Sequence, residues 1–223
     1  MSDILDFSIS DGIATLTMDD GKANAMSPAM SSALNAGLDR ASSEGAKAVI
    51  IKGKPGLLCG GFDLKIIRGD DDVLKTQMRE AGMKLLERLY LSPLPIIFAV
   101  TGHAVAMGAL LLIAGDWRVG IRGDFRIGLN ETGIGLSLPV AGLELARDRL
   151  APVVLSEATI NATLYSPDQA AGIGYLDEAV DADQLDAASQ AAAERLAALD
   201  SAAFALTKSK VRQPTIDRIR ALS

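Results

Sequence analysis

The sequence predicts an α/β fold in two parts: a core of repeated ββα or βαβ units in residues 1–138 and a helical region in residues 139–223. In the first part, short apolar runs rich in β-branched residues alternate with helical patterns and with turns that contain glycine. From Pro139 onward, alanine, leucine, glutamate and arginine dominate, and apolar residues recur at helical spacing. No low-complexity linker separates the parts, so we expect the helical region to pack on the core or on another subunit.

The N-terminal stretch predicts a β-hairpin followed by a helix. Residues 5–9 and 12–18 alternate around Asp11-Gly12, a dipeptide typical of hairpin turns. Ser27-Pro28 suits the N-cap and the first position of a helix, because serine accepts amide hydrogen bonds there and proline needs no donor. We expect this helix to continue to about Arg40.

A buried strand, a long helix and a second buried strand follow. Residues 46–52 and 96–100 are apolar runs rich in β-branched residues, as expected of buried strands. Residues 73–91 show helical periodicity. Pro93 and Pro95 end that helix, because proline cannot continue one.

The remaining predicted elements are mostly helical. A short apolar helix is expected at 109–114, and two strands are expected at 117–121 and 125–129. In the second part we expect an extended link at 175–180 and helices at 140–150, 152–161, 167–171, 182–199 and 202–210.

Composition and charge argue against several classes of protein. The net charge is −6 with no long basic block, which argues against nucleic acid as the main ligand. Cys59 and His103 are the only cysteine and histidine, so neither an intrachain disulfide nor a His/Cys metal site is expected. The longest apolar run, 104–114, is too short to span a membrane, and the N-terminus shows no secretory signal. We therefore expect a cytoplasmic protein that binds neither membrane nor metal.

Two glycine-containing loops and one carboxylate are the candidate functional groups. Residues 57–64 and 100–109 each follow a buried strand and precede a predicted helix. Such a turn exposes backbone N–H groups at a helix N-terminus, where negative charge is favoured. Two of these turns aimed at one point would hold a developing oxyanion. Glu131, in an apolar stretch, is the candidate for moving a proton.

Each feature also has a simpler interpretation. The glycines at 60–61 and 108 are compatible with plain tight turns, and Glu131 with a surface carboxylate or a helix cap. Cys59 suits a small buried position, because no base that would activate it is identifiable. His103 suits a packed loop position.

Segments in the right order along nearly the whole chain resemble the crotonase superfamily, the enoyl-CoA hydratase/isomerase group. Residues 22–27 resemble its first substrate segment, 58–64 its first oxyanion loop and 102–108 its second. Residues 116–119 resemble its next strand, and 167–180 the helix and strand that follow. The resemblance implies a crotonase-like ββα spiral. It also implies a C-terminal helical region that forms a homotrimer or hexamer and is shorter here than is usual for the family.

The resemblance also assigns roles to individual residues. It implies that the backbone N–H groups of Phe62 and Met107, with Gly108 beside them, hold the oxygen of an acyl-CoA thioester. The residues expected to contact the substrate or its CoA part are Lys22, Ala23, Ala25, Gly61, Asp63 and Leu64. Lys208 is expected either to contact CoA phosphates or to lie on a solvated helix face. No cofactor is implied beyond the CoA of the substrate.

The acid/base groups distinguish reactions within the group. Its hydratases usually place one glutamate just after the second loop and another where Glu131 stands, but Leu110 occupies the first position. The stretch 127–132 resembles the Δ3,Δ2-enoyl-CoA isomerases, in which one carboxylate moves a proton from C2 to C4. The favoured hypothesis is therefore isomerisation through Glu131. Hydration, thioester hydrolysis and non-catalytic acyl-CoA binding are the alternatives.

Overall fold

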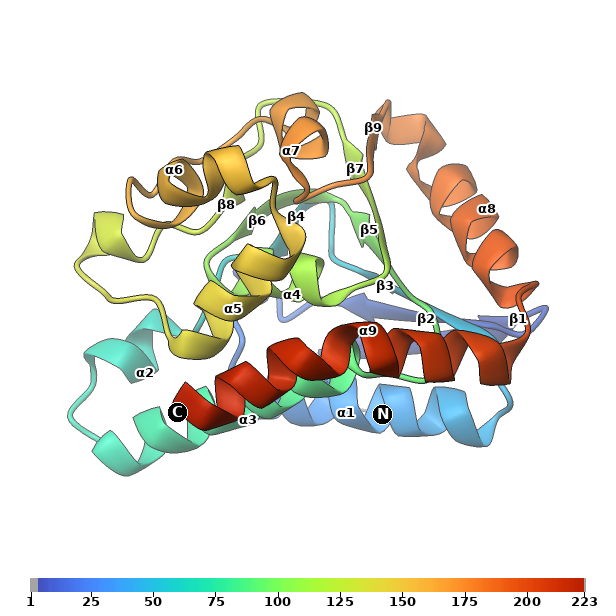
Figure 1. The fold of residues 1–223 in the computed structure, drawn as a ribbon, viewed down its shortest axis with the longest axis horizontal. Coiled ribbons are helices and arrows are strands. Elements are labelled where there is room, and N and C mark those ends of the chain that lie inside the picture. The colour runs from blue at the N-terminus through green and yellow to red at the C-terminus, as the bar shows by residue number, and fades with distance from the viewer. Residues whose placement is uncertain (1–3, 223) are drawn as a thin grey trace.

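The computed structural model describes residues 4–222, and its strands form two sheets (Figure 1). The six-stranded sheet has the order β1 (Leu5–Ser10), β2 (Ile13–Met18), β3 (Ala48–Lys52), β5 (Ile96–Val100), β7 (Trp117–Ile121) and β9 (Glu178–Val180). The three-stranded sheet has the order β4 (Gly56–Cys59), β6 (Gly102–Val105) and β8 (Ile127–Gly128). β1 and β2 pair antiparallel, and the other pairings in both sheets are parallel.

Helices connect and cover the strands. Their bounds are α1 (Pro28–Ser43), α2 (Leu64–Arg68), α3 (Asp72–Tyr90), α4 (Met107–Ala114), α5 (Val140–Arg149), α6 (Leu155–Thr159), α7 (Pro167–Ile173), α8 (Leu185–Ala197) and α9 (Ser201–Leu222). None of the helices in the described range is both long and apolar enough to cross a membrane.

After α1 the chain alternates between the two sheets. β3 leads to β4, β5 leads to β6, and β7 leads to β8, so each turn of the fold contributes one strand to each sheet. The predicted α/β class with repeated ββα units is confirmed. Parts of both predicted loops are strands, because β4 and β6 pair with each other and β6 pairs with β8.

Local signals predicted the N-terminal elements well. Asp11 and Gly12 have φ values of 51° and 77°, as the tight hairpin turn requires. The Ser27 side chain accepts a hydrogen bond from the Met30 amide, and Pro28 is the first residue of α1. The hairpin and the helix start are therefore confirmed.

The larger sheet is buried on both faces. One face carries Ile51 and Phe98 in a cluster with residues of α1, α3 and α4. The other face carries Ile50 and Ile97 in a second cluster, which α8 covers. Every residue of β5 is buried, which explains its continuous apolar run.

Two predicted boundaries are wrong. The strand expected at 125–129 is reduced to β8, because the Arg126 amide donates to Nδ1 of His103 rather than to a neighbouring strand. The helix expected to end at Lys210 continues as α9 to Leu222 with Pro214 inside it. Tertiary packing overrides the local penalty of this proline, because the next two residues of α9 are buried.

Candidate active site

The ends of three parallel strands bring the predicted site segments to one edge of the smaller sheet. Cys59 of β4 lies opposite Ala104 of β6, and Ala104 lies opposite Ile127 of β8. The segments that leave these strands carry Phe62, Met107 and Glu131 respectively. Carboxyl ends of neighbouring parallel strands are where α/β folds most often place their ligands.

The two glycine turns lie against each other. Gly61 has φ 106°, and a Cβ at this position would lie 3.2 Å from Ala106 Cβ and 3.9 Å from the Met107 nitrogen. A Cβ on Gly108 would lie 2.3 Å from the Cys59 carbonyl oxygen, so only glycine fits there. Phe62 and Met107 therefore lie next to two turns that contact each other. The contact itself does not decide between plain tight turns and turns that hold an oxyanion.

Backbone amides at this contact are available to a ligand. Ala106 adopts φ 50° and ψ −120°, a strained conformation for a residue with a side chain, and no side chain caps the start of α4. The Ala106 amide donates to the Gly128 carbonyl at 3.0 Å. Within residues 4–222 no hydrogen bond is donated by the amides of Phe62, Met107 or Gly108. Amides at a helix start bind negative charge well.

Glu131 is buried at the same edge of the sheet. Glu131 is 8% exposed, and its Oε2 atom has no hydrogen-bond partner among the described residues. Burial raises the pKa of its carboxyl group. Burial makes the surface interpretation of Glu131 wrong. Glu131 stands at the N-cap position of the 3₁₀ turn Thr132–Ile134, but its side chain makes no capping hydrogen bond there. In the apolar stretch around Glu131, Ile127 and Leu129 are buried and Ile134 is exposed.

The predicted substrate segment is hydrogen-bonded to the first glycine turn. The Gly60 amide donates to the Ala23 carbonyl at 2.9 Å, and the Met26 amide donates to the Gly61 carbonyl at 2.8 Å. Lys22 and Ala23 are exposed and Ala25 is half-buried, so this segment presents its surface beside the turn.

Asp20 shapes that segment, and its role was not predicted. Its carboxylate accepts the amides of Lys22 at 2.7 Å, Asn24 at 2.8 Å and Ala25 at 3.2 Å. Partial burial opposes ionisation, but these amide hydrogen bonds together lower the pKa of Asp20. The signal in the sequence is the aspartate that starts the Asp20-Gly21 turn, because such side chains bind the backbone two residues on.

The other residues assigned near the acyl group lie around the first turn. The Asp63 side chain caps α2 by accepting the Lys65 amide at 2.8 Å. Leu64 is 45% exposed. Leu110, where hydratases usually carry a second glutamate, is buried, and its methyl group would lie 3.3 Å from a Cβ on Gly142 of α5. That position therefore packs α4 against α5 and supplies no acid or base.

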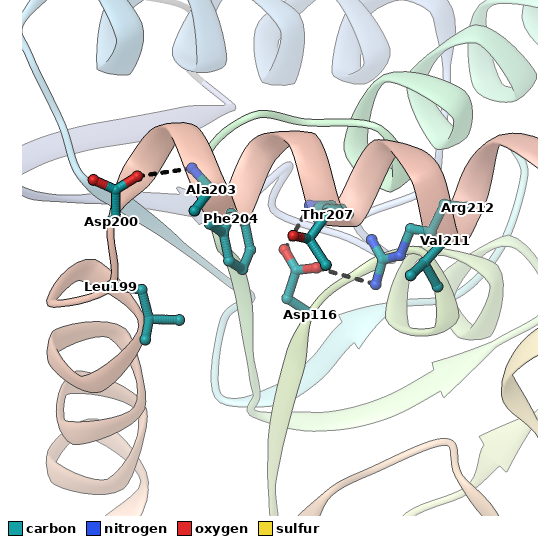
Figure 2. Close-up of a pocket in the computed structure, with 9 residues that line it drawn as sticks. Asp116, Leu199, Asp200, Ala203, Phe204, Thr207, Val211 and Arg212 are labelled. Atoms are coloured by element: carbon teal, nitrogen blue, oxygen red, sulfur yellow. Dashed lines mark hydrogen bonds and ion pairs between the residues drawn. The ribbon is translucent and has the colours of Figure 1, made fainter.

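Lys208 lies at the other end of α4 from Met107. Its Nζ lies 2.6 Å from Oδ2 of Asp116, and Arg212 binds the same carboxylate at 3.0 Å (Figure 2). Burial lowers the pKa of Lys208 to about 8, although Asp116 opposes the shift. A solvated helix face is therefore wrong for Lys208. Contact with CoA stays a prediction, and the structure does not bring this ammonium to the glycine turns.

The remaining candidates have structural roles. His103 accepts a hydrogen bond from the Arg126 amide and packs edge-on against Phe125, with 5.3 Å between ring centroids. Cys59 is fully buried, which confirms the predicted buried position, and burial raises its pKa to about 12. Within residues 4–222 no group of three or more His, Cys, Asp or Glu side chains is arranged to hold a metal ion.

The chain matches known proteins over nearly its whole length. The sequence profile described as "Enoyl-CoA hydratase/isomerase" matches residues 8–221. An enoyl-CoA hydratase/isomerase family protein from Pseudomonas syringae is 42% identical, with a TM-score of 0.95 over 98% of this chain and 94% of that chain. A protein from Mycobacterium tuberculosis is described as an enoyl-CoA isomerase in one solved structure and as a probable enoyl-CoA hydratase in another. In the first of these structures it is 38% identical, with a TM-score of 0.93 over 99% of this chain and 96% of that chain.

A relative among curated sequences is more distant and longer. Mitochondrial enoyl-CoA delta isomerase 1 of Rattus norvegicus is 27% identical over 77% of this chain. This chain spans 60% of the length of that relative. The family profile and the two solved structures show that the chain belongs to the enoyl-CoA hydratase/isomerase family.

Proposed function

We propose that the protein is a Δ3,Δ2-enoyl-CoA isomerase that uses Glu131 as its only acid/base group. The observation that carries the proposal is a buried carboxylate with an unpaired oxygen at the sheet edge where two turns leave amides unpaired. A carboxylate beside a pair of amide donors is suited to forming and holding an enolate.

The reaction requires one proton to leave C2 and one to reach C4. The Glu131 carboxylate removes the C2 proton of a 3-enoyl-CoA. The electron pair of that C–H bond forms a C1=C2 double bond and the carbonyl electron pair moves to the thioester oxygen, which gives a dienolate conjugated with the C3=C4 double bond. The amides of Phe62 and Met107 donate hydrogen bonds to the dienolate oxygen. Protonated Glu131 then delivers the proton to C4, the double bond moves to C2, and the carboxylate is regenerated.

The environment of Glu131 supports this role. Because burial raises its pKa, the carboxylate is a stronger base than an exposed glutamate, and the carboxylic acid formed midway persists long enough to reprotonate C4. The start of α4 and its unpaired amides favour negative charge on the substrate oxygen rather than on the base.

The position of Leu110 separates this proposal from hydration. Hydration needs one group to activate water and another to protonate carbon. Leu110 is 1% exposed and apolar, so it does neither. The names of matched relatives include hydratases as well as isomerases, so the reaction must be decided by product.

Incubation with 3-enoyl-CoA and, separately, with 2-enoyl-CoA tests the proposal. We expect the 2-enoyl isomer from the first substrate and no 3-hydroxyacyl-CoA from the second. Glu131→Gln should lower kcat by about a hundredfold or more while acyl-CoA still binds. Hydroxyacyl-CoA, free CoA or no product would contradict isomerisation and would indicate a hydratase, a thioester hydrolase or a binding protein respectively.

A further inference from the structure

Four side-chain oxygens near the end of β8 are buried without hydrogen-bond partners. Among the described residues they are Asn130 Oδ1, Glu131 Oε2, Tyr165 Oη and Tyr175 Oη. Buried polar groups are normally paired, because leaving one unpaired costs free energy. Unpaired groups close to a proposed base are candidates to pair with that base, directly or through water.

The backbone brings these residues together. Ile127 and Tyr165 exchange both of their backbone hydrogen bonds, at 2.9 and 3.0 Å. The Thr132 hydroxyl donates to the Ile160 carbonyl at 2.9 Å. The segment 160–165 therefore runs beside residues 127–132, and Glu131 lies within that stretch.

Tyr175 lies behind this segment. Its ring centroid is 6.0 Å from that of Tyr165, and the residue is fully buried. The hydroxyl lies beside the Leu129 amide without a hydrogen bond that satisfies it. Burial, with smaller effects of Tyr165 and Glu131, raises the pKa of Tyr175, so its hydroxyl remains a proton donor at neutral pH.

We propose that Tyr175 is a positioning residue for Glu131. Its hydroxyl donates a hydrogen bond, directly or through one water, to Oε2 of the ionised carboxylate, and the other carboxylate oxygen is thereby turned toward the substrate. The role depends on the proposed function, in which Glu131 is the base. Neither oxygen has another hydrogen-bond partner among the described residues, so both are available for this bond in the free protein.

The other ionisable groups near Tyr175 do not compete for this role. Burial, and the nearby carboxylate of the exposed Glu157, raise the pKa of Tyr165 to about 12. Asp177, two residues beyond Tyr175, is paired with Arg118 at 2.6 Å and with Arg149 at 2.5 Å. Tyr165 is therefore a matched control, because its buried hydroxyl lies beside Glu157 rather than Glu131.

Tyr175→Phe and Tyr165→Phe test the proposal, because each removes one oxygen and keeps the ring. The first readout is the pKa of Glu131 in the free protein, measured by infrared difference titration against Glu131→Gln. A hydrogen bond to the ionised form lowers a pKa, so Tyr175→Phe should raise it by about one unit, whereas Tyr165→Phe should leave it unchanged. The second readout is the pH profile of kcat for 3-enoyl-CoA.

For Tyr175→Phe we expect the acidic limb of that profile to move to higher pH and kcat to fall about tenfold, with KM within twofold of the wild-type value. An unchanged Glu131 pKa in Tyr175→Phe, or equal shifts in the two variants, would overturn the proposal. If the Glu131 pKa moves only in Tyr175→Phe but the wild type does not isomerise 3-enoyl-CoA, the pairing stands and the proposed function fails. If the wild type isomerises 3-enoyl-CoA but the Glu131 pKa does not move in Tyr175→Phe, the proposed function stands and the pairing fails.

Discussion

The polar groups at the two ends of α4 differ in whether they are paired. At its start, the Met107 and Gly108 amides donate no hydrogen bond within the described residues, and the nearby Glu131 has an unpaired oxygen. At its end, carbonyl groups accept hydrogen bonds from Arg118 and Arg212. The Asp116 carboxylate there pairs with Lys208 and with Arg212, and Figure 2 shows the pair with Arg212. In the proposed function, the polar groups at the start of α4 bind the substrate, whereas those at its end stabilise the fold.

This contrast follows from the free energy of burying polar groups. A paired buried group stabilises little but costs much when its partner is lost. An unpaired group costs stability in the free protein and gains a partner when substrate binds. Substitutions at the C-terminal end should therefore change stability alone, whereas substitutions at the N-terminal end should change activity.

The largest stability effect is expected from Asp116→Asn at the paired end. The change leaves the Lys208 and Arg212 cations, whose side chains are 4% and 15% exposed, without a counter-charge. We expect the free energy of unfolding in urea to fall by about 3 kcal/mol, as when one partner of a buried ion pair is removed. The rate per folded molecule should stay within about twofold of the wild type.

Asp186→Asn is the matched control for that substitution. It breaks the pair between Asp186 and Lys52, whose side chains are 79% and 25% exposed and whose charged atoms lie 2.7 Å apart. An exposed pair contributes about 0–1 kcal/mol, so the loss should be small. Equal losses in the two variants would show that burial does not distinguish the two ion pairs.

The next effect is expected from Gly108→Ala at the unpaired end. A Cβ 2.3 Å from the Cys59 carbonyl forces the two turns apart, at a cost of about 1–3 kcal/mol in unfolding free energy. Because the same movement displaces the Met107 amide, kcat should fall by about a hundredfold. Gly172→Ala in α7 is the control, since a Cβ there meets nothing within 4 Å, and it should alter neither quantity appreciably.

The contrast also explains what the sequence could and could not predict. The Asp11-Gly12 turn and the Ser27 cap depend on neighbours in the chain, and both were predicted. The burial of Lys208 and the continuation of α9 through Pro214 depend on partners about a hundred residues away, which periodicity does not reveal. Asp20 is intermediate, because its hydrogen bonds are local in sequence, but the loop they hold matters only through its hydrogen bond to Gly60, which is far along the chain.

Glu131 itself should destabilise the fold at neutral pH. Its pKa is raised in the folded state, so the folded protein holds this proton more tightly than the unfolded chain. Its favourable contribution is present below the unfolded pKa and is lost as pH rises through the folded value. Glu131→Gln should therefore gain stability over the wild type as pH rises across that window. A difference in unfolding free energy that stays constant from acid to neutral pH would contradict an elevated pKa.

The smallest effect is expected from Ala106→Gly, which relaxes the strained residue that opens α4. A residue at φ 50° and ψ −120° costs about 1–3 kcal/mol, and the added freedom of glycine in the unfolded chain offsets about 0.5–1 kcal/mol of that. Unfolding free energy should thus rise slightly, while kcat should fall severalfold because the Met107 amide is held less rigidly. Ala162→Gly, at φ 53°, is the matched control and should relieve strain without lowering kcat. An unaltered kcat in Ala106→Gly would mean that the strain does not hold the amide in place.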